Sequence, residues 1–248
     1  MSDEHKVFIC TVAWGGAYPR ALARMIQQFA EHSPGYQVRG WCNVLPPGTP
    51  HIEENGYDYT GYAAKPFALR ECMEDDATIA ILLDASFYPV RDIGPQVEHI
   101  AREGYYLCDN GFQVGEWISD RALNGMVASG REWAMGLKEC SSYCVGLNFK
   151  NKSVNCEGLL KDWCCLASVP SILAGPHENT AHQPKRRSMR NPGWCSSDPR
   201  VKGHRHDQSI LSILAHQYGM TNFIPRPKYT CYKAGATAET VLVNDGIN

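Results

Sequence analysis

The sequence lacks several features that would place the chain in a familiar class. Its 248 residues carry a formal net charge of only -2. That balance argues against nonspecific nucleic-acid binding, although a local basic face would still allow such contact. No apolar run approaches the roughly 20 residues that span a bilayer. The polar segment 1–6 lacks the apolar core of a signal peptide, so we expect a cytoplasmic protein.

Motifs of several enzyme classes are also missing. The chain has no P-loop, no Gly-x-Gly-x-x-Gly fingerprint and no Gly-x-Ser-x-Gly elbow, so nucleophilic triads find little support. Cysteine, by contrast, is abundant. The 11 thiols are odd in number and several lie in apolar runs, so we expect reduced core thiols. A structural zinc ion is disfavoured because Cys140 and Cys144 have no second pair at zinc-site spacing.

Extended and helical patterns alternate along the chain. Strands are predicted at 6–12, 37–44, 78–83, 105–108 and 143–149, and helices at 18–31, 65–75, 95–102, 153–168 and 207–218. This alternation predicts an α/β sandwich with a mostly parallel central sheet, in a single domain over residues 1–248. Residues 116–136 read as helical and loop-rich. Periodicity vanishes between 175 and 202, where we expect a functional loop.

The predicted strand at 78–83 runs straight into Asp84. A buried strand that ends on Asp delivers the carboxylate to the rim of an α/β sheet, where ligands bind. Asp84 could also be a helix cap or a turn former. As a ligand-binding residue it would hold a hard metal ion or a ribose hydroxyl, and Ser86 could add a second, weaker oxygen.

A second polar cluster, His204-Arg205-His206-Asp207-Gln208, precedes a predicted helix. A solvated loop could hold these residues without a role. In a site, an imidazole can ligate a divalent ion and Arg205 can bind diphosphate oxygens bidentately. Asp207 could hold a sugar hydroxyl or act as a base, with Gln208 orienting it. The start of a helix also favours anions.

Two further segments carry open alternatives. The basic stretch 185–190 fits a solvated loop, an electrostatic cover over a pyrophosphate, or a nucleic-acid contact within 185–205. The segment 109–111 fits a simple turn. Together with 115–120 it also fits a polar, aromatic patch for sugar recognition, in which Trp117 stacks on a ring. In that case Glu116 and Asp120 would share one helical face.

The order of these motifs resembles that of glycosyltransferases with a GT-A fold, especially the glycogenin- and galactosyltransferase-like group and bacterial or phage relatives of uncharacterised specificity. The matching pieces are the first strand with Thr11, and then 62–66, 81–86 with 91–93, 146–149, and 206–209. Segment 81–86 looks like the family's Asp-x-Asp strand, and 206–209 looks like its late Asp-Gln motif.

The resemblance implies a GT-A-like, Rossmann-like three-layer sandwich, a nucleotide-diphosphate sugar as donor, and a divalent metal, Mn²⁺ or Mg²⁺. With the patterns above, it assigns donor binding to Thr11, Ala13, Trp14, Lys65, Asp84, Ala85, Ser86, Asn148 and Arg205. It assigns metal binding to Asp84, Ser86 and His206. Catalysis is assigned to Asp207, Gln208 and Asp109, and acceptor binding to Asn110, Glu116, Trp117 and Asp120.

The chain departs from the family pattern at two places. Ser86 stands where the second Asp of Asp-x-Asp is usual, and the late His of the metal shell has no counterpart near 225–232. Either His204 or His206 takes the place of that late His as a metal ligand, or Arg and Lys side chains neutralise the diphosphate without a metal.

We therefore predict a hexosyl- or pentosyltransferase that moves a sugar to an acceptor hydroxyl. That hydroxyl could belong to a polysaccharide, a small molecule, a protein, or a hydroxymethylpyrimidine in phage DNA. The alternatives are an inactive nucleotide-sugar-binding protein and a metal-dependent phosphoester hydrolase.

Overall fold

The computed structural model describes residues 5–127, 130–181, 191–225, 230–232 and 236–246. Its central sheet has five strands in the order β2-β1-β5-β8-β7. Their bounds are β1 Val7–Ala13, β2 Gln37–Cys42, β5 Ile79–Leu83, β7 Tyr105–Gln113 and β8 Lys138–Asn148. Strand β1 runs parallel to β2 and β5, whereas β8 is antiparallel to both β5 and β7. The predicted α/β fold with a mostly parallel sheet is confirmed.

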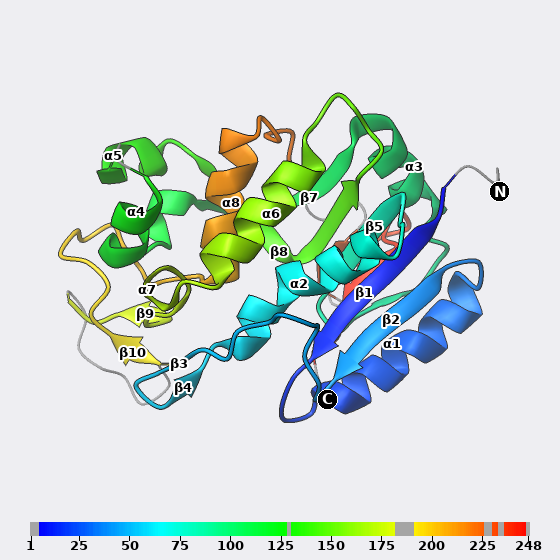
Figure 1. Ribbon diagram of the computed structural model, residues 1–248, viewed down its shortest axis with the longest axis horizontal. Coiled ribbons are helices and arrows are strands. Elements are labelled where there is room, and N and C mark those ends of the chain that lie inside the picture. The colour runs from blue at the N-terminus through cyan, green and yellow to red at the C-terminus, as the bar shows by residue number, and fades with distance from the viewer. Residues whose placement is uncertain (1–4, 128–129, 182–190, 226–229, 233–235, 247–248) are drawn as a thin grey trace.

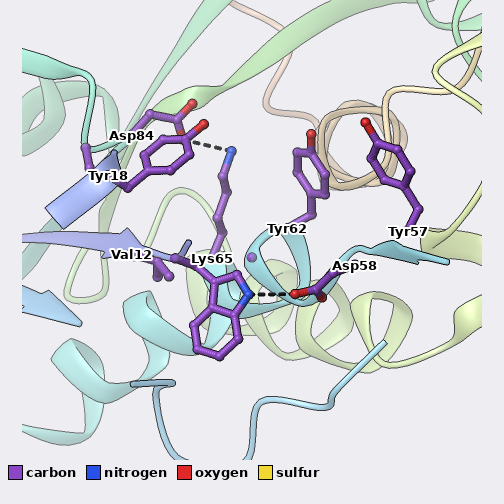
Figure 2. Close-up of a pocket in the computed structure, with 10 residues that line it drawn as sticks. Val12, Tyr18, Tyr57, Asp58, Tyr62, Lys65 and Asp84 are labelled. Atoms are coloured by element: carbon purple, nitrogen blue, oxygen red, sulfur yellow. Dashed lines mark hydrogen bonds and ion pairs between the residues drawn. The ribbon is translucent and has the colours of Figure 1, made fainter. Parts of the chain in front are cut away.

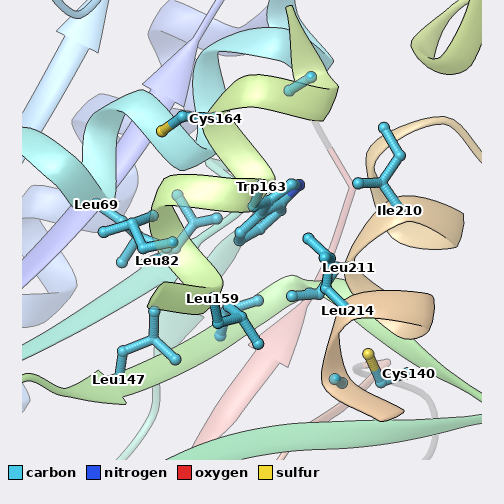
Figure 3. Close-up of a cluster of buried hydrophobic side chains, with 14 of the residues drawn as sticks. Leu69, Leu82, Cys140, Leu147, Leu159, Trp163, Cys164, Ile210, Leu211 and Leu214 are labelled. Carbon is cyan, nitrogen blue, oxygen red and sulfur yellow. The ribbon is translucent and has the colours of Figure 1, made fainter. Parts of the chain in front are cut away.

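Helices cover both faces of this sheet (Figure 1). Successive strand residues point to opposite faces. Phe8 and Leu82 accordingly join one buried cluster, while Ile9 and Ile81 join another. The first face carries α2 Thr60–Glu74, α6 Cys156–Ala167 and α8 Asp207–Gln217, and the second carries α1 Tyr18–His32 and α3 Gly94–Glu103. In Figure 3, Trp163 of α6 lies among apolar side chains of α6 and α8. The predicted three layers are therefore present.

Short elements complete the described chain. The minor strands are β3 Glu53–Glu54 with β4 Tyr57–Asp58, β9 Glu178–Asn179 with β10 Pro192–Gly193, and β6 Phe87–Pro89 with β12 Leu242–Asn244 and β11 Thr230–Tyr232. The short helices are η1 Val114–Glu116, α4 Asp120–Met126, α5 Gly130–Met135 and α7 Pro170–Leu173. Elements α4, α5, α7, β9 and β10 gather at the end of the molecule opposite α1 and β2 (Figure 1).

Several predicted boundaries are wrong. Helix α2 begins at Thr60 rather than Lys65, and Asp58 Oδ1, just before the helix, accepts the Thr60 N–H at 2.8 Å. Strands β7 and β8 extend beyond the predicted 105–108 and 143–149, because their pairing continues across two irregularities of register. The segment 109–111 is therefore part of a strand and not a simple turn.

The predicted helical face shared by Glu116 and Asp120 is also wrong. Helix η1 ends at Glu116, and α4 begins separately at Asp120. Glu116 pairs with Lys202 at 2.6 Å, while Asp120 pairs with Arg131. The two carboxylates are neutralised by different partners and do not form one surface.

The described parts of 175–202 are ordered by side-chain hydrogen bonds rather than by periodic structure. Asn179 is buried, and its Nδ2 donates to the carbonyl oxygens of Ser196 at 2.9 Å and Val201 at 3.1 Å. Its Oδ1 accepts the Cys195 N–H at 3.1 Å. Such hydrogen bonding has no apolar period, which explains why the sequence reads as structureless. The basic stretch 185–190 lies outside the described residues.

The ten cysteines with described side chains are free thiols, and eight of them are buried. This arrangement agrees with the expected reduced core thiols. In the described part of the chain, no helix combines the length and apolar character needed to cross a bilayer.

Candidate functional site

Two cavities meet at the carboxyl ends of β1 and β5. The first, about 230 Å³, is the aromatic chamber, lined by Val12, Trp14, Tyr18, Tyr57, Asp58, Gly61, Tyr62, Lys65, Asp84 and Ala85 (Figure 2). The second, about 270 Å³, is the polar chamber, lined by Tyr62, Lys65, Asp84, Trp117, Ser142, Tyr143, His177, Glu178, Arg205, His206, Asp207 and Gln208. They share Tyr62, Lys65 and Asp84. This edge of an α/β sheet is where ligands bind in such folds.

The two chambers join at an ionised triad. Lys65 Nζ, on α2, lies 2.9 Å from Asp84 Oδ1 and 2.9 Å from Asp207 Oδ2. It also donates to Ser142 Oγ at 3.3 Å. Burial alone would lower the pKa of Lys65, but Asp207 and Asp84 outweigh burial and raise it, so the ammonium stays charged. The Asp84 side chain, 34% exposed, is the open end of the triad.

Asp207 is the buried member of the triad. It is the first residue of α8, and its side chain is only 3% exposed. Burial raises the pKa of Asp207, while Lys65 opposes the rise. A carboxylate held this way is a stronger base than one in water.

Hydrogen bonds fix the aromatic chamber. Trp14 Nε1 donates to Asp58 Oδ2 at 2.8 Å, as Figure 2 shows. Burial raises the pKa of Asp58, but hydrogen bonds from Thr60 and Trp14 outweigh burial and lower it. The rings of Tyr18, Tyr57 and Tyr62 complete the lining. Flat apolar walls with a few fixed polar groups suit a planar ring system.

His206 closes the inner side of the polar chamber. Its ring centroid lies 4.7 Å from that of Tyr62 and 5.0 Å from that of Tyr59. Its Nδ1 donates to the Leu173 carbonyl oxygen at 3.0 Å, because a carbonyl can only accept. Burial lowers the pKa of His206 well below its usual value, so the ring is neutral. Its Nε2 accordingly accepts from His177 Nδ1 at 2.6 Å.

Arg205 is held against the indole of Trp117. The guanidinium carbon lies 3.8 Å from the ring centroid, and the backbone N–H of Arg205 donates to the Trp117 carbonyl oxygen at 3.0 Å. Ser209 Oγ donates to the same oxygen at 2.7 Å. Arg205 covers one face of the indole, so Trp117 is a platform for Arg205. The predicted stacking of a sugar on Trp117 stays a prediction.

The predicted metal ligands do not form a metal centre. Asp84 Oδ1 is paired with Lys65, and both ring nitrogens of His206 are engaged within the protein. Ser86 is 8% exposed and lines neither chamber. In the described ranges, no group of three or more His, Cys, Asp or Glu side chains can hold a metal ion. The residues present therefore do not fit the Mn²⁺ or Mg²⁺ site that the resemblance implies.

Asn148 is predicted near the transferred sugar but lies at the other edge of the sheet. Its register partner is Ile79, at the start of β5, whereas Asp84 follows the end of that strand. Strand β8 is antiparallel, so its carboxyl end points away from the chambers. Ser142 and Tyr143 of the same strand line the polar chamber instead.

Other predicted residues lie outside the lining of both chambers. Asp109 Oδ1 accepts the Gly111 N–H at 2.7 Å, and Asn110 Nδ2 donates to Glu139 Oε2 at 2.7 Å. Thr11 and Ala13 are fully buried in β1. The residues predicted and found in the chamber linings are Trp14, Lys65, Asp84, Ala85, Trp117, Arg205, His206, Asp207 and Gln208.

Sequence reasoning missed several lining residues: Tyr18, Tyr57, Asp58, Tyr62, Ser142, Tyr143, His177 and Glu178. Tyr62 lies three residues before Lys65 and shares its face in α2, but the predicted helix began at Lys65 and left Tyr62 outside. His177 carries none, because only the fold brings it to His206.

No protein-family model and no curated protein matches the sequence. Among solved structures, one described as a glycosyltransferase involved in the glycosylation of the major capsid of PBCV-1 is similar in fold, with 10% identity and a TM-score of 0.49. The match covers 96% of this chain and 94% of that chain. A likeness at this level supports neither an activity nor a ligand for this chain.

Proposed function

We propose that this protein transfers a sugar from a nucleotide-diphosphate sugar to an acceptor hydroxyl. The observation that carries the proposal is the meeting of the aromatic and polar chambers at Lys65 and Asp84, with Asp207 on the polar side. Glycosyl transfer needs a place for a flat base, a place for a hydroxylated second substrate, and ionisable groups between them. The arrangement of the two chambers supplies all three.

The donor would span the junction of the chambers. Its base would lie against Trp14 and Tyr18 in the aromatic chamber, since aromatic walls favour a planar ring. Asp84, one-third exposed, would accept hydrogen bonds from ribose or sugar hydroxyls. Arg205, held on Trp117, would bind the diphosphate oxygens through its planar fork of donors.

The transfer exchanges one bond for another at the anomeric carbon. The bond from this carbon to the diphosphate oxygen breaks, and the nucleoside diphosphate leaves with the electron pair. The acceptor oxygen forms the new bond, and its proton passes to a base. We assign Asp207 to the reacting centre because it is buried and fixed by Lys65, and Gln208 to hydroxyl binding in the same chamber.

The charges of the polar chamber favour a neutral, hydroxylated acceptor. Glu178 and Asp207 line it along with Arg205, and carboxylates accept hydrogen bonds from hydroxyls but repel the phosphates of nucleic acid. A sugar hydroxyl of a polysaccharide or small molecule fits this chamber better than a base in DNA. The hydrolase alternative finds no support, because both ring nitrogens of His204 and of His206 already hydrogen-bond within the protein.

A thermal-shift screen against nucleotide-diphosphate sugars and free nucleoside diphosphates, with and without manganese, tests the proposal. A ligand that binds only the folded state adds about 2.7 kcal/mol of stability at a hundred times its dissociation constant. We expect one nucleotide family to raise the melting temperature, and Asp84→Asn to remove most of the rise. The matched control is Asp76→Asn, at an exposed carboxylate that pairs with Lys150 at 3.8 Å.

The outcomes separate the alternatives. If no nucleotide raises the melting temperature, the proposed function is wrong. If the shift survives Asp84→Asn unchanged, the binding site lies elsewhere. A nucleotide sugar that binds but never releases nucleoside diphosphate, with any glycoside acceptor or with water, identifies a binding protein instead of an enzyme.

A further inference from the structure

A carboxyl group is buried behind the wall of the polar chamber. Glu139, the second residue of β8, is 0% exposed, which is rare for Glu unless the group is paired. Its Oε2 accepts from Asn110 Nδ2 at 2.7 Å, and Asn110 Oδ1 accepts from Ser141 Oγ at 3.1 Å. Oε2 of this carboxylate thus has a partner on β7, whereas Oε1 has none there.

That other oxygen lies beside an equally buried donor. In the described part of the chain, neither Glu139 Oε1 nor Gln208 Nε2 forms a hydrogen bond of normal geometry. Burial raises the pKa of Glu139, and the Gln208 side chain opposes this rise as a hydrogen-bond donor. Buried polar atoms seldom remain unpaired. The Gln208 amide therefore turns its NH₂ group towards Glu139.

We propose that Glu139 is a positioning residue that holds the Gln208 amide nitrogen inward, so that the carbonyl oxygen faces the polar chamber and accepts a hydrogen bond from a ligand hydroxyl. An amide carbonyl oxygen accepts and never donates. The ligand group at this point is therefore a sugar hydroxyl and not a phosphate oxygen, because a phosphate oxygen also accepts and needs a hydrogen-bond donor from the protein. This inference rests on the proposed function and deepens it, because it separates the sugar end at Gln208 from the diphosphate end at Arg205.

The charge of Glu139 depends on groups from several elements. Burial raises its pKa from 4.5 to about 7, Arg205 before α8 lowers it, and Glu116 in η1 raises it. Cys140, beside it on β8, stays a neutral thiol because burial raises its pKa to about 12. Once protonated, Glu139 carries an O–H donor and can bond the amide oxygen instead. The Gln208 orientation is thus fixed when Glu139 is ionised and relaxed when it is protonated.

The test is side-chain NMR of the ¹⁵N-labelled full chain, with the Gln208 NH₂ signals identified by their loss in Gln208→Glu. These signals should titrate with a midpoint of about 7, and Glu139→Gln should abolish the titration. Asn110→Ala removes a hydrogen bond that lowers the pKa of Glu139, so the midpoint should move upward. The control Glu132→Gln, at a side chain 81% exposed and paired with Arg200, should leave it unchanged.

The chemical class of the ligand that binds at Gln208 is tested with two probes, a series of methyl glycosides and inorganic pyrophosphate. At least one glycoside should shift the Gln208 NH₂ signals, whereas pyrophosphate should shift the Arg205 Nε signal and leave Gln208 unchanged. Gln208 signals that respond to no glycoside, or that respond to pyrophosphate, would overturn the hydroxyl assignment.

The orientation itself is overturned if the wild-type signals do not titrate, or if their titration survives Glu139→Gln. The wild-type and Asn110→Ala titrations decide the question if Glu139→Gln fails to fold. None of these measurements requires a nucleotide to bind. Failure of the proposed function would appear in the nucleotide screen and is therefore distinguishable from failure of this inference.

Discussion

Removing the ammonium from the triad should destabilise the protein strongly. In Lys65→Met the apolar stem is retained, but Asp207 loses its counter-charge at 2.9 Å while its side chain remains 3% exposed. Breaking a buried ion pair from one side costs about 3–5 kcal/mol, because a charge is left buried without compensation. Loss of the contact between Lys65 and Asp84 adds little to this cost, because the Asp84 side chain is 34% exposed and solvent screens an exposed pair.

The sign of the pH dependence follows from the carboxylate. Burial raises the pKa of Asp207, and without Lys65 only the hydrogen bond from Ser142 opposes that rise. A carboxyl whose folded pKa exceeds its unfolded value makes the folded state bind protons more tightly. Stability is then lost as pH rises from the unfolded pKa, about 3.9, through the folded one. The loss in the free energy of unfolding caused by Lys65→Met should therefore become smaller as pH falls. The double variant Lys65→Met/Asp207→Asn should recover most of that loss at neutral pH.

Urea denaturation followed by tryptophan fluorescence measures these differences, because Trp163 is fully buried. The control is Lys150→Met, at a side chain 63% exposed that pairs with Asp76 at 3.8 Å, which should change stability by less than about 0.5 kcal/mol. A loss below about 1 kcal/mol for Lys65→Met, or a further loss on adding Asp207→Asn, would refute a buried ionised triad.

Two further variants test the wall of the polar chamber. Trp117→Ala should weaken nucleoside-diphosphate binding by roughly 5–30-fold, since a partly desolvated cation–π contact is worth about 1–2 kcal/mol. Calorimetry should show Trp117→Phe near wild type, and equal affinity for the Ala variant would contradict the platform role. Gly203→Ala places a Cβ 1.8 Å from the His177 carbonyl oxygen, so the melting temperature should fall by roughly 6–12 °C for a cost of about 3 kcal/mol. Gly136→Ala, whose nearest atom is 3.4 Å away, is the control, and equal melting temperatures would contradict close packing at 203.

Much of the fold was predictable because its signals are local. All five residues of β5 are buried, and a buried parallel strand reads as a continuous apolar run. The polar residue that ends such a run, Asp84, must then lie at the sheet edge. Asp207 was predictable for a similar reason, because it directly precedes the apolar pattern of α8. The sequence could therefore nominate both carboxylates of the triad.

The errors arose where strand direction or long-range contact decides position. Asn148 ends β8, and only the antiparallel pairing of β8 with β5 moves it to the far edge of the sheet. Glu139 is the second residue of the same strand, and it meets Asn110 of β7 across 29 residues of sequence. His177 meets His206 across 29 residues. No local periodicity encodes these distances, so a single sequence cannot supply them.

The backbone at His206 shows how the polar chamber is held in shape. This residue precedes α8 with φ 48° and ψ −120°, a conformation that costs a non-glycine residue about 1–3 kcal/mol. Its ring is nevertheless fixed by Leu173 and His177, so the surrounding contacts over-determine the strained turn. Arg205 and Asp207 flank His206 in the sequence. In the proposed transfer, charged groups that are fixed before the substrate arrives would need little reorganisation as charge develops on the leaving diphosphate.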